Sequence, residues 1–123
     1  MLFKADFAFR RVNDITPEFL FENNIKGLLL DLDNTLTTHD NPVPCKGVEE
    51  WLKEMKSFGI KLIIVSNNHP ERVKPFADML GLNFISEGKK PLSSGFNRAQ
   101  VKLGIPFSQL AVVGDQILSL IHI

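Results

Sequence analysis

The chain has 123 residues, of which 44% are hydrophobic and 23% are charged, a composition typical of one globular domain spanning residues 1–123. Lysine plus arginine and aspartate plus glutamate number 14 each, so charge gives no support to a nucleic-acid partner, and none is expected. The single cysteine, Cys45, excludes an internal disulfide and is consistent with a reducing, cytoplasmic compartment. No apolar run approaches the roughly 20 residues that cross a bilayer.

The N-terminal segment combines phenylalanines with basic residues over positions 3–11. One interpretation is an arm that seeks the headgroup region of a membrane. The other, which we favour, is a segment whose phenylalanines pack on the domain. Next, Thr16-Pro17-Glu18 predicts a helix start, because threonine is a common N-cap and proline suits the first helical position. This helix would end near residues 23–24, and the apolar run 26–32 predicts a buried strand.

Helices and strands then alternate along the rest of the chain. The spacing of apolar residues and the positions of proline and glycine predict helices over 48–58, 70–80 and 93–103 and strands over 60–65, 82–85 and 110–113. This alternation predicts an α/β fold with right-handed crossovers and a mostly parallel sheet covered by helices. In such sheets, ligands bind at the carboxyl ends of the strands. Four polar residues lie at or just after predicted strand ends: Asp31, Ser66, Lys90 and Asp115.

The run Asp31-Leu32-Asp33-Asn34-Thr35 follows the first buried strand and suggests phosphate chemistry. Hydrolysis of a phosphate ester needs an oxyanion nucleophile, a cation that reduces charge repulsion, and a proton for the leaving alkoxide. Asp31 is placed to attack phosphorus, which would form an aspartyl-phosphate. Asp33 can protonate the leaving group and then deprotonate the hydrolytic water. Mg²⁺, which prefers oxygen ligands, suits Asp31, Asp33 through its backbone carbonyl, and Asp115.

Residues after the later strands can bind the phosphoryl group. The Ser66 hydroxyl can hydrogen-bond a phosphoryl oxygen, and Asn67 beside it is a second candidate phosphate contact. Lys90 can neutralise the nucleophile and the charge that develops on the phosphoryl group, so it is expected to be both catalytic and phosphate-binding. Each pattern alone also fits an ordinary turn or loop. Their joint occurrence, in this order and after predicted strands, favours a phosphatase with a phosphorylated substrate.

These residues resemble the four motifs of the haloacid dehalogenase (HAD) superfamily, namely Asp31-x-Asp33-x-Thr35, Ser66, Lys90 and Gly114-Asp115. More closely, the runs 30–36, 65–68 and 89–92 are similar to the YqeG-type phosphatases of HAD subclass IIIA, which are related to mitochondrial phosphatidylglycerophosphatases. The resemblance implies a Rossmann-like, three-layer α/β/α core, Mg²⁺ dependence and phosphomonoester hydrolysis. It makes phosphatidylglycerophosphate, or another phosphate on a lipid headgroup, a candidate substrate.

Loop lengths add an independent expectation about access to the site. About ten residues separate Thr35 from the helix start near Lys46, and fewer separate the third strand from Lys90. Neither insertion can hold a cap domain, so the site should be open. An open site suits a large or membrane-borne substrate better than a small sugar phosphate that needs enclosure. Contact with a membrane surface is therefore one of the partner interactions that the sequence allows. The sequence leaves the oligomeric state open.

The C-terminal end departs from the superfamily pattern. A second acid usually follows Gly-Asp, but Leu120 stands at that position, and its absence is expected to weaken Mg²⁺ binding. The family also continues for at least one more strand and helix, whereas the apolar run 117–123 ends this sequence. We therefore expect a chain without its last strand and helix, with an exposed sheet edge beside the strand 110–113. A naturally short member with a buried tail is the alternative.

Two other functional interpretations stay open. A catalytically impaired fragment, or a non-catalytic phosphate-binding module, would account for the missing acid at position 120. A phospho-accepting receiver domain also combines acids, a hydroxyl and a lysine on a parallel sheet. The receiver interpretation is disfavoured, because its phosphorylated aspartate normally ends a middle strand, and here that strand ends in Ser66.

Overall fold

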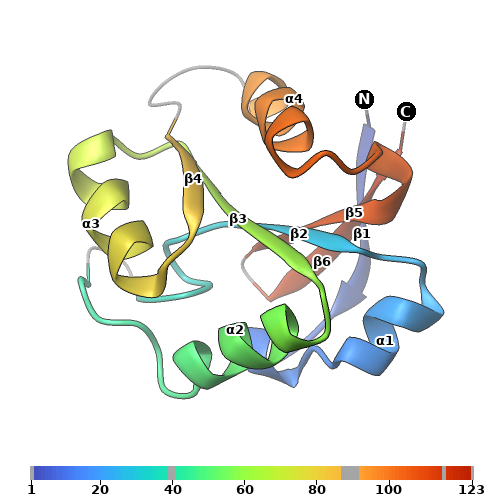
Figure 1. Cartoon of the computed structure of the whole chain (residues 1–123), viewed down its shortest axis with the longest axis horizontal. Coiled ribbons are helices and arrows are strands. Elements are labelled where there is room, and N and C mark those ends of the chain that lie inside the picture. The colour runs from blue at the N-terminus through green and yellow to red at the C-terminus, as the bar shows by residue number, and fades with distance from the viewer. Residues whose placement is uncertain (1, 39–40, 87–91, 115, 123) are drawn as a thin grey trace.

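A computed structural model describes residues 2–38, 41–86, 92–114 and 116–122. It contains a six-stranded sheet with the order β1-β6-β5-β2-β3-β4 (Figure 1). The strands are β1 (Leu2–Ala8), β2 (Gly27–Leu30), β3 (Lys61–Ser66), β4 (Asn83–Ser86), β5 (Leu110–Gly114) and β6 (Ile117–His122). The helices are α1 (Pro17–Glu22), α2 (Val48–Ser57), α3 (Pro70–Leu80) and α4 (Leu92–Leu103), with the 3-10 helices η1 (Val12–Asp14) and η2 (Phe107–Gln109).

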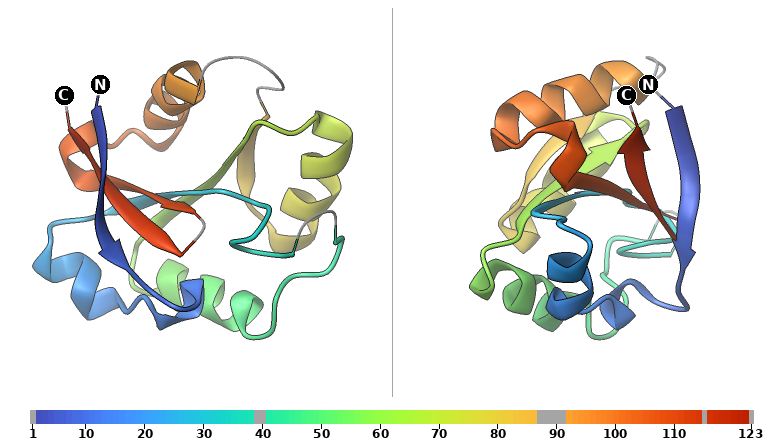
Figure 2. Two further views of the ribbon diagram at one scale, coloured as in Figure 1. Left: turned by 180° about the vertical axis from the view of Figure 1, so that it is seen from behind. Right: turned by 90° about the vertical axis from the view of Figure 1, so that its right-hand side faces the viewer.

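The sheet is mostly parallel and lies between two layers of helices. Strands β2, β3, β4 and β5 run parallel, whereas β1 and β6 pair antiparallel with their neighbours. One hydrophobic cluster joins α1, α2 and α3 to one face of the sheet, and a second joins α4 to the other face (Figure 2). The predicted three-layer α/β architecture is therefore confirmed.

The predicted elements between residues 16 and 114 are present, with ends that shift by one or two residues. Helix α1 begins where the sequence indicated: the Thr16 hydroxyl accepts a hydrogen bond from the Phe19 amide at 3.1 Å, and Pro17 is the first helical residue. Helix α3 ends at Gly81, whose φ of 68° lies in the left-handed region that glycine tolerates. None of the helices in the described ranges is long and apolar enough to cross a membrane.

Strand β2 is buried on both faces, which explains its continuous apolar sequence. It pairs in parallel with β3 on one side and with β5 on the other. Leu28 and Leu30 contribute to the cluster beneath α1, α2 and α3, and Leu29 contributes to the cluster beneath α4. Because all four residues of β2 are buried, the chain first reaches solvent at Asp31, which is exposed.

The expectation of an exposed edge beside the strand 110–113 is wrong. The apolar run after residue 116 forms β6, which pairs antiparallel with β5 and covers that edge. The N-terminal segment forms β1, which pairs with the other side of β6, so the first and last strands lie side by side (Figures 1 and 2). Leu120, at the position of the usual second acid, is a partly buried residue of β6 that packs against the core.

Two phenylalanines of the N-terminal segment, Phe7 and Phe9, pack on the domain. The Phe7 ring meets the Phe19 ring edge-on, with 4.8 Å between the centroids. Phe7 and Phe9 are both partly buried against the larger hydrophobic cluster. These two aromatic side chains are therefore used in packing, which supports the favoured interpretation of this segment over a membrane-seeking arm.

The Asp6 carboxylate accepts a hydrogen bond where the pairing of β1 with β6 is irregular. The register shifts between Ala5 and Phe7, so Asp6 lies in a bulge. Its Oδ2 accepts a hydrogen bond from the Leu120 amide at 2.8 Å. The Asp6 side chain thus accepts from the backbone amide of Leu120, a partly buried residue. Without Asp6, the bulge would leave this amide without a partner in β1.

We predict that Asp6→Ala lowers the free energy of unfolding by about 1–3 kcal/mol, because the partly buried Leu120 amide loses its acceptor. Asp6→Asn keeps a side-chain oxygen and should cost less. Urea unfolding of the two variants and wild type measures the difference, and Asp78→Ala, which removes an exposed i,i+4 partner of Lys74, is the matched control. An Asp6→Ala midpoint equal to that of the control would contradict the prediction.

Candidate active site

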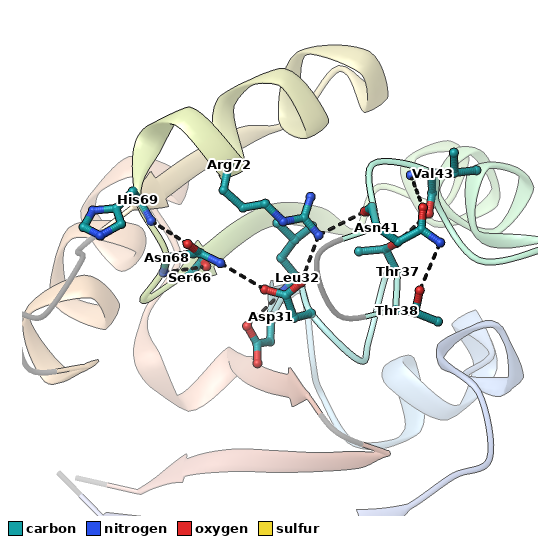
Figure 3. Close-up of polar contacts among 11 residues, drawn as sticks. Asp31, Leu32, Thr37, Thr38, Asn41, Val43, Ser66, Asn68, His69 and Arg72 are labelled. Atoms are coloured by element: carbon teal, nitrogen blue, oxygen red, sulfur yellow. Dashed lines mark hydrogen bonds and ion pairs between the residues drawn. The ribbon is translucent and has the colours of Figure 1, made fainter.

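Asp31 lies at the carboxyl edge of the sheet, between the ends of β2 and β5. Its amide donates to the Val113 carbonyl at 2.9 Å, which continues the parallel pairing of the two strands by one residue. Its carboxylate Oδ1 accepts a hydrogen bond from the Leu32 amide at 2.8 Å, and the residue is exposed (Figure 3). The backbone of Asp31 is thus fixed by the sheet while its carboxylate is presented to solvent.

Gly114 brings the backbone of β5 against this carboxylate. A Cβ placed on Gly114 would lie 3.2 Å from the Asp31 Cβ and 3.6 Å from its Oδ2. A larger residue would therefore press on the Asp31 side chain. The close approach means that the chain leaving β5 toward position 115 starts directly beside the Asp31 carboxylate.

The Asp33 carboxylate contacts two residues that follow β3 in the chain, Asn68 and Arg72. Its Oδ1 lies 2.9 Å from the Arg72 guanidinium, and its Oδ2 accepts a hydrogen bond from the Asn68 amide group at 3.3 Å. The side chains of Asp33 and Arg72 are only 19% and 17% exposed, so solvent screens this ion pair weakly. The structure thus connects the turn after β2 to the segment after β3, as expected from the parallel sheet.

Asn68 organises the turn that follows β3. Its amide donates to the Ser66 hydroxyl oxygen at 3.0 Å, and its side-chain oxygen accepts from the His69 amide at 2.9 Å (Figure 3). Its carbonyl accepts a hydrogen bond from the Ser86 hydroxyl. Ser66 is 3% exposed, and Asn67 is exposed. In the described residues Asn68 contacts Asp33, and Asn67 stays a predicted phosphate contact.

Arg72 is the site residue that sequence reasoning missed. Besides Asp33, its guanidinium donates to the Asn41 carbonyl at 3.0 Å and lies 5.9 Å from the centre of the Phe76 ring. It occupies the first turn of α3, where the helix dipole disfavours a cation. The sequence did contain a signal for Arg72: a basic residue in the first turn of the helix that follows the strand ending in Ser66. A cation at that end of a helix is unfavourable unless an anionic group lies nearby.

The loop after Asp33 is compact. Thr37 is fully buried, and its hydroxyl lies within hydrogen-bond distance of the Asn41 and Val43 carbonyls. The Cys45 amide donates to the Leu36 carbonyl at 2.8 Å, which closes the loop before α2. These contacts turn the segment back on itself, so its described part forms a turn at the sheet edge and fits the predicted capless site.

Two of the predicted site residues, Lys90 and Asp115, lie outside the described residues. In the part of the chain that the structure describes, no group of three or more histidine, cysteine, aspartate or glutamate side chains could hold a metal ion. The described donors at the site are the carboxylate of Asp31 and the oxygens of Asp33. Oxygen donors of this kind fit a hard cation such as Mg²⁺.

We predict that Arg72 and Asp33 are energetically coupled. In a double-mutant cycle with Arg72→Ala and Asp33→Asn, measured by urea unfolding, the interaction energy should reach about 1–3 kcal/mol, because the pair is shielded from solvent. The matched control is the exposed pair Lys74–Asp78, whose side chains are 62% and 60% exposed. A cycle for Arg72 and Asp33 that is no larger than the control cycle would contradict the prediction.

The sequence and the structure of this chain are similar to those of known hydrolases. Residues 38–118 match the haloacid dehalogenase-like hydrolase family. A relative from Bacillus subtilis, named Probable phosphatase YqeG, is 44% identical over 117 residues, which are 95% of this chain and 68% of the relative. Among solved structures, a Vibrio cholerae protein assigned as 3-deoxy-D-manno-octulosonate 8-phosphate phosphatase superimposes with a TM-score of 0.60 at 20% identity, over 82% of this chain and 62% of that one.

A second structure, the 3-deoxy-D-manno-octulosonate 8-phosphate phosphatase of Moraxella catarrhalis, superimposes with a TM-score of 0.55 at 23% identity, over 80% of this chain and 63% of that one. This chain thus spans about three fifths of the length of both structural neighbours, and the likeness to them establishes the shared fold. The family match and the YqeG relative together confirm the resemblance to HAD hydrolases and to YqeG, whereas the assignment to subclass IIIA and the relation to phosphatidylglycerophosphatases stay predictions. The chain belongs to the haloacid dehalogenase-like hydrolases.

Proposed function

We propose that the chain hydrolyses phosphomonoesters through an aspartyl-phosphate formed on Asp31. The observation that supports this best is the exposed Asp31 carboxylate at the end of β2, with the backbone of β5 passing beside it at Gly114. A second carboxylate, Asp33, follows two residues later and is held by Arg72 and Asn68. An accessible nucleophile and a positioned acid–base group are the two protein parts that this reaction requires.

The reaction would proceed in two displacements at phosphorus. In the first, an Asp31 carboxylate oxygen bonds to phosphorus while the bond to the alcohol oxygen breaks, and Asp33 gives its proton to that oxygen. In the second, Asp33 takes a proton from water, the water oxygen bonds to phosphorus, and the bond to Asp31 breaks. The products are the alcohol and inorganic phosphate, and both aspartates return to their starting states.

The ion pair with Arg72 bears on the role of Asp33. A guanidinium 2.9 Å from the carboxylate favours its ionised form, which is the form that accepts a proton from water. The first displacement needs the protonated form instead. We therefore propose that substrate binding weakens the contact between Asp33 and Arg72, since a phosphoryl group is itself an anion that a guanidinium can bind.

Mg²⁺ is the cofactor we propose, held by the Asp31 carboxylate, the Asp33 backbone carbonyl and Asp115. The described donors are oxygens, and Asp115 follows Gly114, whose backbone already lies beside Asp31. The structure of the Moraxella catarrhalis neighbour contains a magnesium ion and a phosphate ion. Bound Mg²⁺ would supply positive charge that reduces repulsion between the nucleophile and the phosphoryl oxygens.

The remaining predicted contacts belong to the same proposal. We assign Ser66, Asn67 and Lys90 to the phosphoryl group, with Lys90 also balancing charge on Asp31. The buried Ser66 hydroxyl already accepts the Asn68 amide, so a contact with phosphate would use the hydroxyl hydrogen.

The compact loop after Asp33 supports a site open to a large substrate. Phosphatidylglycerophosphate, or another phosphate on a lipid headgroup at the cytoplasmic face of a membrane, is therefore our candidate for the physiological substrate. The subclass IIIA relationship suggested by the motifs supports the same candidate.

The direct test is phosphate release from p-nitrophenyl phosphate, with Mg²⁺ and with EDTA. We expect Mg²⁺-dependent release by wild type, loss of release in Asp31→Asn, and a drop of about 10²–10⁴-fold in Asp33→Asn. Asp14→Asn, which changes an exposed aspartate outside the site, should keep full activity. No release by folded protein would contradict the proposed function and favour a phosphate-binding module.

Metal binding can be measured without turnover. We expect Mg²⁺ at 100 times its dissociation constant to stabilise wild type by about 2.7 kcal/mol, because ligand binding to the folded state shifts the unfolding equilibrium. Asp31→Asn should lose most of this gain, and Asp14→Asn should retain it. Thermal unfolding with and without Mg²⁺ provides the measurement, and equal stabilisation of wild type and Asp31→Asn would remove Asp31 from the proposed ligands.

A further inference from the structure

A cavity opens at the edge of the sheet opposite to Asp31, where β3 and β4 begin. Its volume is about 360 Å³. Its walls come from the first residues of these two strands and from the C-terminal ends of α2, α3 and α4. The lining residues used below are Lys56, Gly59, Lys61, Gly81, Asn83 and Lys102, and they define what we call the lysine cavity.

The lysine cavity is distant from the candidate active site. Lys61, which lines the cavity, begins β3, and Ser66 ends the same strand at the edge where the site lies. A strand rises about 3.3 Å per residue, so about 16 Å separates the two positions. The described lining includes none of the residues that surround Asp31 or Asp33. A ligand in this cavity would therefore leave both aspartates accessible to a substrate.

The charge of the lysine cavity is positive. The charged side chains in its described lining are all basic, namely Lys56, Lys61 and Lys102. In the part of the chain that the structure describes, no carboxylate forms an ion pair with any of these three ammonium groups. Asp78, an acid near the end of α3, pairs with Lys74 instead, at 2.7 Å. Because the chain as a whole is neutral, this excess of cations is a local feature.

Helix ends offer an alternative explanation for two of the lysines. Lys56 and Lys102 lie in the last turns of α2 and α4, where a cation is favourable, and α3 also ends at the cavity, at Gly81. The C-terminal end of a helix is equivalent to about half a negative charge, so three helix ends do not neutralise three ammonium groups. Lys61 begins a strand, and sheets have only small net dipoles. Helix ends therefore do not account for Lys61.

The wall of the lysine cavity is partly preorganised for a ligand. The Lys56 Nζ donates to the Leu80 carbonyl at 3.4 Å and to the Gly81 carbonyl at 3.3 Å, which places the ammonium group between α2 and α3. An ammonium group has three donors, so a third N–H can point to a ligand. A Cβ placed on Gly59 would have no atom within 4 Å, so a ligand can approach the backbone there.

We propose that the lysine cavity binds a chain of phosphate groups. Three ammonium groups from different elements can each contact a different phosphate of such a chain, and lysine binds phosphate as a point charge. The Asn83 side chain, which is exposed, adds an uncharged donor. The inference is independent of the proposed hydrolysis, because the cavity lies at the other edge of the sheet. Inorganic tripolyphosphate and the triphosphate of a nucleotide share this chemistry.

Glycine amide signals can report binding at each edge of the sheet separately. The chain has eight glycines, of which Gly59 and Gly81 line the cavity and Gly114 lies beside Asp31. We would label the glycines with ¹⁵N and titrate the protein with inorganic tripolyphosphate or orthophosphate in the presence of EDTA. Tripolyphosphate should shift the Gly59 and Gly81 signals to saturation and bind about tenfold more tightly than orthophosphate, since it can contact several ammonium groups. Added salt should weaken this binding.

Substitutions then assign the binding to the cavity. The variant Lys61→Gln/Lys102→Gln should lower the affinity for tripolyphosphate about tenfold. The matched control Lys46→Gln/Lys53→Gln removes the same charge from exposed residues outside the cavity and should keep the affinity. Lys61→Gln alone should lower the affinity about threefold, and it supplies the same evidence if the double variant does not fold. Lysines that served only the helix ends would leave Lys61→Gln without effect.

Each outcome has a distinct meaning. Unmoved Gly59 and Gly81 signals, equal affinity for tripolyphosphate and orthophosphate, or unchanged affinity in Lys61→Gln/Lys102→Gln would overturn the inference. An equal loss of affinity in the control would also overturn it, because the anion would then respond to overall charge. ATP that binds as tightly as tripolyphosphate would support a nucleotide as the ligand, and weaker binding of ATP would support an inorganic chain. The signals need no turnover, so a failure of the proposed hydrolysis would not change them.

Discussion

The parallel pairing of β2 between β3 and β5 is the constraint on which the site depends. Its four residues are buried on both faces, so the chain can turn toward solvent only at Asp31. The hydrogen bond from the Asp31 amide to the Val113 carbonyl extends the pairing by one residue and prevents this position from drifting. If Asp31 is the nucleophile, as we propose, its attachment to the sheet means that it needs little reorganisation before it reacts.

A second constraint is electrostatic. The first turn of α3 contains a cation that the helix dipole disfavours, and the turn after β2 contains a carboxylate with little exposure to water. Each residue compensates the other across a gap of 39 positions in sequence, and the Asn41 carbonyl adds a third member. This arrangement connects the loop after Asp33 to the residue that we propose as the acid–base group, so we expect the loop and Asp33 to respond to substrate together.

The helices and strands from α1 to β5 could be predicted from short stretches of sequence. Each is indicated by the spacing of its apolar residues, by an N-cap residue or by a glycine at its end, and none of these features depends on distant residues. The same signals placed Asp31 and the segment after β3 at one sheet edge. The two outer strands could not be found in this way. The pairing of β1 with β6 joins residues that are 109 to 120 positions apart. The apolar run 117–123 has neither a cap nor a turn residue, so its sequence does not distinguish an outer strand from a truncated end. Likewise, the contact between Asn68 and Asp33 depends on the direction of the turn after Ser66, which a motif does not contain.

The two ends of the chain also connect fold and specificity. β1 is needed to cover β6, and its bulge at Asp6 is repaired by a side chain rather than by regular pairing. The segment that leaves β1 passes Gln116 on its way to η1, and this path brings Arg10 and Arg11 to a cavity that Thr35 also lines. The N-terminal segment therefore borders the turn after Asp33, because Arg10, Arg11 and Thr35 line the same cavity. The surroundings of the proposed site thus depend on a terminal strand that packs as part of the sheet.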